Sequence, residues 1–194
     1  MARHSTMVCQ VCRLQPHVLA SAPPLAISAE MIWREGGCLE LSYGLLPLGG
    51  LATPVVAEQV LGSWAEANSK GTRRDLLWEH TCFEAFLGLP NDERYWELNV
   101  SPSGDWNLYR FERYRQGGEP EVAAIAPTIT VQHGGRGLRC RVQLDPRGFW
   151  PASVVPDIAL TMVVERVGGS LSYWALAHPG DQADFHDRRG FLVP

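Results

Sequence analysis

The sequence predicts an all-β fold, an antiparallel sandwich of two sheets, on the strength of three observations. Apolar and polar residues alternate over several short stretches, as they do in strands that bury one face. Glycine pairs separate these stretches, and glycine tolerates the positive φ that tight hairpins need. The chain has 194 residues, 45% hydrophobic and 20% charged, which is ordinary globular composition and suits one domain over residues 1–194.

Three alternating stretches lie beside Gly-Gly pairs at 36–37, 134–135 and 168–169. In each stretch every second residue is apolar, so one face of the predicted strand is buried. The apolar positions are Leu39, Leu41, Tyr43 and Leu45; Leu138, Cys140, Val142 and Leu144; and Ile158, Leu160, Met162 and Val164.

Three segments fall outside this alternating pattern. Residues 54–74 are an excursion in which apolar residues at helical spacing are interrupted by a glycine, so one short helix at most is expected there. Residues 1–10 are expected to be frayed. Residues 177–194 are expected to form a C-terminal loop that packs on the sandwich.

Charge and cysteine usage limit the function classes. The net charge is −4 with acids and bases interspersed, which differs from the basic surface of a nucleic-acid binder. The five cysteines have no framework spacing, which indicates a reducing compartment. Cys9 and Cys12 form a lone CxxC without the second half of a zinc site. No secretory signal or membrane span is evident, so a cytoplasmic location without membrane or nucleic-acid partners is expected.

The stretch LWEHTCFEAF, residues 77–86, raises the question of a site, because three ionisable groups stand in a predicted strand. If residue 85 pairs with residue 96 across the turn PNDE, Glu84 stands directly opposite Glu97. The predicted core face then carries Phe83, Ala85, Leu87, Trp96 and Leu98. The opposite face carries His80, Cys82, Glu84, Phe86, Tyr95, Glu97 and Asn99.

Two facing glutamates need solvent, a cation or a shared proton, because like charges across a ladder are destabilising. His80 and Arg110 are the candidate cations. We expect the strand register that brings Arg110 beside the glutamates, since a one-residue slip would push Arg110 into the core. That slip would place Asn107, Tyr109 and Phe111 there instead. A solvated face with surface ion pairs is an equally good interpretation.

The last part of the chain offers His178, Asp184 and His186. Such nitrogen and oxygen ligands suit a zinc or iron site. The favoured alternative is a tethered loop in which His178 or His186 hydrogen-bonds to protein and Phe185 and Phe191 pack against the sandwich.

Three motifs resemble the bacterial DOMON-like domain proteins, which are related to family 9 carbohydrate-binding modules. They are LWEHTCFEAF, YWELNVSPSGDWNLYRFERYR and SYWALAHPGDQADFHDRRGF, in that order, with LQPH near the beginning. The resemblance covers nearly the whole chain and implies a DOMON-type β-sandwich. Relatives in the wider superfamily bind haem or sugars through the concave face and loops of one sheet. The resemblance itself assigns no ligand.

These observations favour a non-catalytic module that binds a sugar or a similar small polar ligand. Carboxylates and amides pair with hydroxyls, while indole rings cover the C–H face of a sugar. Haem binding is an alternative, since histidines that serve as axial ligands are present. A protein-interaction module and a glycosidase-like enzyme using Glu84 and Glu97 are further alternatives. The predicted ligand-binding residues are Trp78, His80, Glu84, Glu97, Asn99, Trp106, Arg110, Trp174, His178, Asp184 and His186.

Overall fold

The structure is a computed structural model that describes residues 6–18, 21–34, 37–48, 71–134, 137–152 and 154–193. This part of the chain contains eleven strands and three short 3-10 helices. The strands are β1 (Thr6–Pro16), β2 (Leu25–Arg34), β3 (Cys38–Pro47), β4 (Cys82–Gly88), β5 (Tyr95–Val100), β6 (Trp106–Arg113), β7 (Gln116–Pro120), β8 (Thr128–Gly134), β9 (Gly137–Leu144), β10 (Asp157–Glu165) and β11 (Leu171–Ala175); the helices are η3 (Leu77–Glu79), η4 (Pro146–Gly148) and η5 (Arg188–Gly190).

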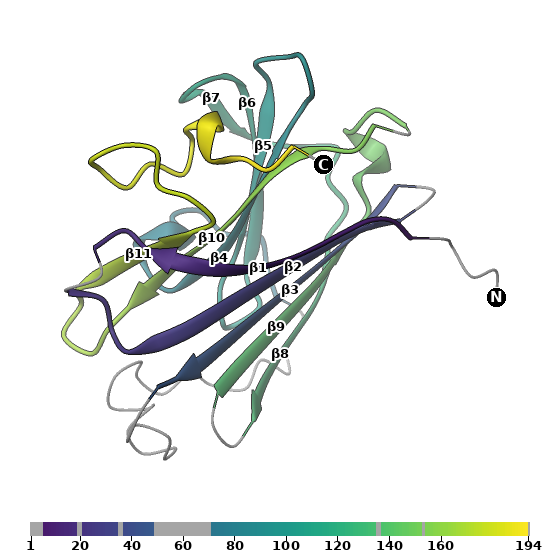
Figure 1. Cartoon of the computed structure of the whole chain (residues 1–194). Helices are drawn as coiled ribbons and strands as arrows, with labels where there is room; N and C mark the ends of the chain where they lie inside the picture. Colours follow the sequence, from purple (N-terminus) through teal and green to yellow (C-terminus); the bar gives the residue numbers. More distant parts are fainter. Residues whose placement is uncertain are drawn as a thin grey trace.

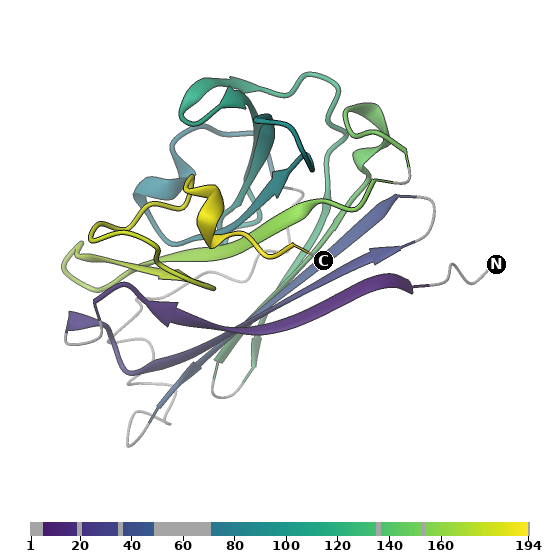
Figure 2. The same cartoon turned by 45° about the horizontal axis from the view of Figure 1, so that its top comes forward.

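The strands pair antiparallel in the order β7-β6-β5-β4-β10-β11-β1-β2-β3-β9-β8. The sheet folds over so that two layers face each other (Figures 1 and 2). Layer A contains β1, β2, β3, β9 and β8, and layer B contains β11, β10, β4, β5, β6 and β7. The short ladder at Gln15↔Ala175 and Pro16↔Trp174 joins the layers. The predicted all-β sandwich is therefore confirmed.

Apolar side chains from the inner faces of both layers form one core. All the apolar positions of the three alternating stretches are buried in it, as predicted. The inner face of β4 and β5 contributes Phe83, Ala85, Leu87, Trp96 and Leu98, also as predicted. Tyr43 of layer A packs on Phe83 of layer B, with 5.4 Å between their ring centres.

The predicted pairing of Glu84 with Glu97 is wrong, although the two faces were assigned correctly. Ala85 pairs with Leu98, so Glu84 stands opposite Asn99 and Glu97 opposite Phe86. The turn is PNDE, as expected, and Leu89 N–H donates to Arg94 O to close it; a turn closed by this pair requires residue 85 to pair with residue 98. The register shift is two residues, and an even shift keeps every side chain on its face.

The expected position of Arg110 is also wrong. Glu97 pairs with Tyr109, so Arg110 stands opposite Trp96 and points to the other side of the sheet. There its guanidinium lies 2.8 Å from Glu112. Only the first four residues of β6 are buried, so Arg110 lies beyond the core and reaches water. The desolvation penalty that led us to reject this register does not arise.

The N-terminal expectation needs correction, because residues 6–10 belong to β1 and pair with β2. Cys9 and Cys12 stand three positions apart on this strand and therefore point to opposite faces. This excludes the CxxC as a joint ligand pair or a disulfide in this conformation. The helix expected within 54–74 lies outside the described residues, except for 71–74, which are not helical.

The C-terminal segment, residues 176–193, crosses the outer face of layer B (Figure 2). Leu192 exchanges backbone hydrogen bonds with Ile158, and Phe191 is buried. Arg188 fixes the segment by donating to the backbone oxygen of Asp92 and to the Asp157 carboxylate. None of the described helices is long and apolar enough to cross a membrane.

Candidate functional site

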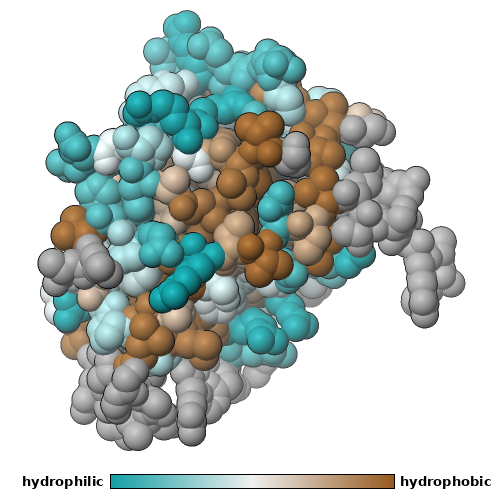
Figure 3. Space-filling model, viewed as in Figure 1, coloured by the Kyte–Doolittle hydropathy of each residue, from teal (hydrophilic) through white to brown (hydrophobic). Residues whose placement is uncertain are grey.

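The outer face of layer B is covered rather than exposed to solvent. Every residue of β4 and β5 is buried, on both faces of the sheet. The cover is the C-terminal segment together with the turn between β6 and β7. A second apolar cluster lies beneath it, formed by Phe86, Tyr95, Ala159 and Phe191 with Phe111 and Phe185. Hydrophobic surface also gathers around the C-terminal segment on the outside (Figure 3).

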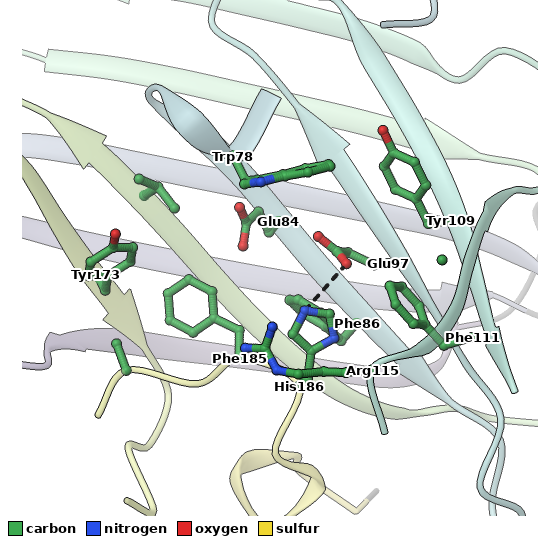
Figure 4. Close-up of a pocket in the computed structure, with 13 residues that line it drawn as sticks. Trp78, Glu84, Phe86, Glu97, Tyr109, Phe111, Arg115, Tyr173, Phe185 and His186 are labelled. Atoms are coloured by element: carbon green, nitrogen blue, oxygen red, sulfur yellow. Dashed lines mark ion pairs between the residues drawn. The ribbon is translucent and has the colours of Figure 1, made fainter. Parts of the chain in front are cut away.

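A cavity of about 380 Å³ lies between this face and its cover (Figure 4). We call it the outer-face pocket. Glu84 and Glu97 stand on its floor, and aromatic rings form most of its walls. Its lining residues are Trp78, Glu84, Phe86, Glu97, Tyr109, Phe111, Arg115, Gly118, Val163, Tyr173, Ala183, Phe185 and His186.

The two floor carboxylates are unequally partnered. Asn99 Nδ2 donates to Glu97 Oε1 at 2.9 Å. Thr161 Oγ1 donates to Glu84 Oε2 at 3.2 Å. Glu84 Oε1 is buried, and no nitrogen or oxygen donor from the described residues reaches it. An oxygen in this position is left with unmet hydrogen-bonding capacity, which costs free energy unless a proton or a ligand satisfies it.

Burial also changes the acidity of both carboxyls. Removal from water raises the pKa of Glu84 well above its ordinary value, and the neighbouring Glu97 charge raises it further. Burial raises the pKa of Glu97 to about 7, although the Asn99 hydrogen bond and Arg115 act in the other direction. The two groups stand diagonally across the β4–β5 ladder, where one charge disfavours the other. Both effects favour the protonated form, so the floor holds a proton to higher pH than exposed carboxyls do.

His186 reaches the pocket from the C-terminal segment. Arg115 N–H donates to the Tyr95 hydroxyl, which in turn lies 2.8 Å from His186 Nδ1. The hydroxyl can donate its proton to Nδ1 or accept one from it, and the tautomer of a neutral ring follows from that direction. Nε2 lies 3.8 Å from Glu97 Oε2. Burial lowers the pKa of His186 to about 4, so the ring is uncharged at neutral pH.

Arg115 supplies the positive charge at the pocket. It stands in the turn after β6, where it adopts a φ of 52°. Its Nη2 lies 2.9 Å from Asp184 Oδ1, and Asp184 also accepts from the Tyr114 hydroxyl. Arg115 thus performs the role that we expected of Arg110, but its own partner is an aspartate of the C-terminal segment.

The aromatic walls come from four parts of the chain. Trp78 stands on η3, which begins after Leu76 in a left-handed conformation with φ 62°. Its ring meets Tyr109 of β6 edge to face, with 5.5 Å between ring centres. Phe185 of the C-terminal segment meets Tyr173 of β11 at 6.0 Å. Figure 4 shows Trp78 on one side of Glu84 and Phe185 on the other.

The structure brings four of the predicted site residues into the outer-face pocket: Trp78, Glu84, Glu97 and His186. Asn99 and Asp184 lie behind the lining, where they hold Glu97 and Arg115.

The other five predicted residues lie elsewhere. Trp106 and Trp174 are buried in the core between the layers, which corrects their assignment as ligand-facing rings. Arg110 is on the other side of the sheet. His80 lies beside Glu165 in a separate, shallower surface cavity. His178 Nε2 lies 2.9 Å from the backbone oxygen of Gln15.

The structure does not assemble the possible metal site. His178 contacts His17 and the Gln15 backbone, His186 contacts Tyr95, and Asp184 is paired with Arg115. Among the residues that the structure describes, no three metal-binding side chains come close enough to share an ion. Both histidines have protein partners, which is the arrangement that the tethered-loop interpretation predicts.

Nine lining residues were not predicted as site residues: Phe86, Tyr109, Phe111, Arg115, Gly118, Val163, Tyr173, Ala183 and Phe185. For Tyr109 and Phe111 the signal was present, because the rejected register of β6 places both on the glutamate face. Tyr173 alternates with Trp174 on β11, so burying Trp174 would have turned Tyr173 outward. Arg115 and Phe185 stand in a turn and a loop, where no periodicity indicates direction.

Comparison with known proteins bears on the fold alone. No protein-family model matches the chain, and no curated protein matches it. One solved structure, of a proposed carbohydrate-binding protein from Bacteroides uniformis, is similar with a TM-score of 0.60. The two chains are 12% identical, and the match covers 94% of this chain and 84% of the other. The likeness thus supports the β-sandwich fold, while membership of the DOMON-like family stays a prediction.

Proposed function

We propose that the protein is a non-catalytic binding module whose outer-face pocket takes a sugar or a similar small polar ligand. One observation carries the proposal. Glu84 is 2% exposed and lines a cavity walled by aromatic rings, and its Oε1 has no nitrogen or oxygen donor among the described residues. A buried acceptor without a donor is costly, and a ligand hydroxyl placed in the cavity would supply the donor.

The size and lining of the pocket support a ligand of this kind. A cavity of about 380 Å³ is at the small end of the range for ligand pockets. A few fixed polar groups on an apolar wall are typical of sites that orient a small ligand. The Trp78 ring offers a flat surface for the C–H face of a sugar. The similar Bacteroides structure, described as a proposed carbohydrate-binding protein, adds support.

The geometry favours binding over catalysis. A glycosidase needs its two carboxyl groups on either side of the bond to be cleaved. Glu84 and Glu97 instead stand side by side on adjacent strands and face the same cavity. Haem binding is also less favoured, because His186 uses Nδ1 for Tyr95 and directs Nε2 toward Glu97. Neither nitrogen is directed away from its neighbours toward an axial position.

A binding assay tests the proposal. Tryptophan fluorescence and calorimetry with a panel of mono- and oligosaccharides should show saturable binding to at least one. Trp78→Ala should weaken that binding about tenfold or more, because it removes the ring wall. His80→Ala is the matched control, since His80 is exposed, close in sequence and outside the pocket.

Two outcomes would contradict the proposal. One is the absence of binding to the whole panel while the protein is folded. The other is equal loss of binding in the Trp78 and His80 variants, which would place the ligand elsewhere. Added hemin serves as a second arm, because a saturable Soret shift that His186→Ala removes would favour haem instead.

A further inference from the structure

We propose that the ligand of the outer-face pocket carries a protonated amino group, held on the floor by Glu84 and Glu97, and that the ligand class is an amino sugar. The inference rests on the proposed function and specifies its substrate class. It follows from what the floor contains, from what it lacks and from the nature of the walls.

The floor has two acidic groups and little charge compensation. The titratable groups that face Glu84 are Cys82 on β4, Glu97 on β5, Tyr109 on β6, Arg115 in the following turn and His186 on the C-terminal segment. Tyr43 of layer A donates to its backbone oxygen from the other side. Three of these six groups are neutral hydroxyls or thiols under ordinary conditions.

The positive groups beside the pocket are already engaged. Arg115 is ion-paired with Asp184 at 2.9 Å. His186 is kept as a neutral ring by burial and by the nearby charge of Arg115, which lower its pKa. Within the described lining, therefore, Glu84 and Glu97 lack a cation of their own. A cation that enters from solvent would meet both a buried oxygen without a donor and an uncompensated charge.

The walls favour a cation over a neutral polar group. The face of an aromatic ring attracts an ammonium group, most strongly when water is excluded. Trp78, Tyr109 and Phe185 surround the space above the carboxylates (Figure 4). A carboxylate beneath a set of aromatic rings is the arrangement by which proteins hold ammonium ligands.

A neutral sugar meets only part of this requirement. A hydroxyl group would satisfy Glu84 Oε1 as a donor, but it would bring no positive charge to a floor that carries two acidic groups. An ammonium group offers three donors and a full charge. It would replace the proton that the floor retains, so binding should release a proton to the buffer.

Matched sugars separate these possibilities. We would measure binding of glucosamine, glucose and N-acetylglucosamine, and of the galactose equivalents, by calorimetry at about pH 6, where a sugar amine is protonated. The amino sugar should bind about tenfold tighter than its neutral counterparts. Its apparent binding enthalpy should change with the ionisation enthalpy of the buffer, because a proton is released, whereas that of the neutral sugars should not.

Variants test the role of the floor. Glu84→Gln should remove the preference for the amino sugar and the buffer dependence while neutral sugars still bind. Glu97→Gln provides a second variant if Glu84→Gln loses its cooperative thermal transition. Glu79→Gln is the control, because Glu79 is an exposed carboxylate next to Trp78 that lines the other cavity.

The outcomes distinguish this inference from the function on which it rests. If neutral and amino sugars bind equally, the inference is wrong and the sugar-binding function stands. If the amino sugar is preferred equally by the wild type and Glu84→Gln, the floor is not the cation site and the inference is again wrong. If no sugar binds to the folded protein, the proposed function fails and the inference fails with it.

Discussion

The outer faces of the two layers differ, although both layers are antiparallel sheets in one sandwich. In layer A, buried residues alternate with more exposed ones along β2 and β9. In layer B, by contrast, β4 and β5 are buried at every position and β10 at all but its two ends. Layer A has one buried face and layer B has two.

The difference shows how covering the outer face of a sheet changes the demands on its polar groups. An outer face in water can carry charges at little cost, as Glu40 and Arg34 do at 2.8 Å on layer A. A covered outer face must satisfy each polar group or leave it to a ligand. Glu84 and Glu97 stand on such a face, which explains why their acidity is changed and why a cavity remains beside them.

The largest expected effect is a difference in how much the two outer faces contribute to the stability of the protein. Phe86→Ala should lower the free energy of unfolding by about 3 kcal/mol, because Phe86 is 1% exposed and packs in the second apolar cluster. Val11→Ala on the outer face of layer A should change it by less than about 0.5 kcal/mol, since Val11 is 70% exposed. Urea denaturation measures both. Equal effects would show that the outer face of layer B is not a second core.

The next effect is a difference in pH dependence. The pKa of Glu97 rises from 4.5 to about 7 on folding, so the native state binds its proton more tightly. The stability from this group is complete below about pH 4.5 and is lost as the pH rises through about 7. Glu97→Gln should remove a fall in stability of about 3 kcal/mol over that interval. Denaturation at a series of pH values measures the change.

Glu40 on layer A provides the opposite sign. The hydrogen bond from Arg34 lowers the pKa of Glu40, so its stabilisation is present above pH 4.5 and is lost on acidification. Glu40→Gln should therefore reduce the loss of stability at acidic pH and leave the pH dependence near neutrality unchanged. The burial of His186 opposes Glu97, since a histidine pKa lowered to about 4 costs stability as the pH falls below 6.5. We therefore compare the pH dependence of stability of each variant with that of the wild type. If Glu97→Gln and Glu40→Gln changed this dependence in the same direction, the prediction would be contradicted.

The smallest expected effect concerns two threonines. Thr161→Val removes the donor to Glu84 Oε2 and should cost about 1 kcal/mol, because it leaves a buried carboxyl without that bond. Thr130→Val makes the same substitution at an exposed position on β8 of layer A, and it should hardly change the free energy of unfolding. Thermal unfolding followed by circular dichroism resolves the pair. If Thr161→Val leaves the stability unchanged, another group must satisfy the hydrogen-bonding capacity of Glu84.

Much of the fold was predictable, because the alternation of apolar and polar residues along a strand indicates which of its faces is exposed to water. The strands with the apolar positions of residues 39–45 and 138–144 were placed correctly for this reason. The face of Glu84 and Glu97 was also correct, although their register was wrong by two residues. Alternation has a period of two, so it identifies a face and leaves an even register shift undetermined.

Less of the site was predictable, because its cover comes from segments without periodicity. Glu84, Glu97, Trp78 and His186 were identified as candidates, while Arg115 was not. A turn residue such as Arg115 is positioned by the φ of its own backbone and by Asp184, which is remote in sequence. Arg110 was preferred instead because we took the end of β6 to be buried. The point at which a strand extends beyond the core depends on how far the opposite layer reaches, which the sequence of the strand itself does not indicate.

The C-terminal segment also determines when the outer face of layer B becomes covered during synthesis of the chain. The chain is made from its N-terminal end, so β4 and β5 are complete well before Phe185, His186 and Phe191 exist. Until then the aromatic outer face of layer B has no cover, and exposed apolar surface on a growing chain invites association with other chains. The same last residues that shield this face also complete the pocket wall. The synthesis of these residues therefore covers the aromatic face and completes the cavity in one step.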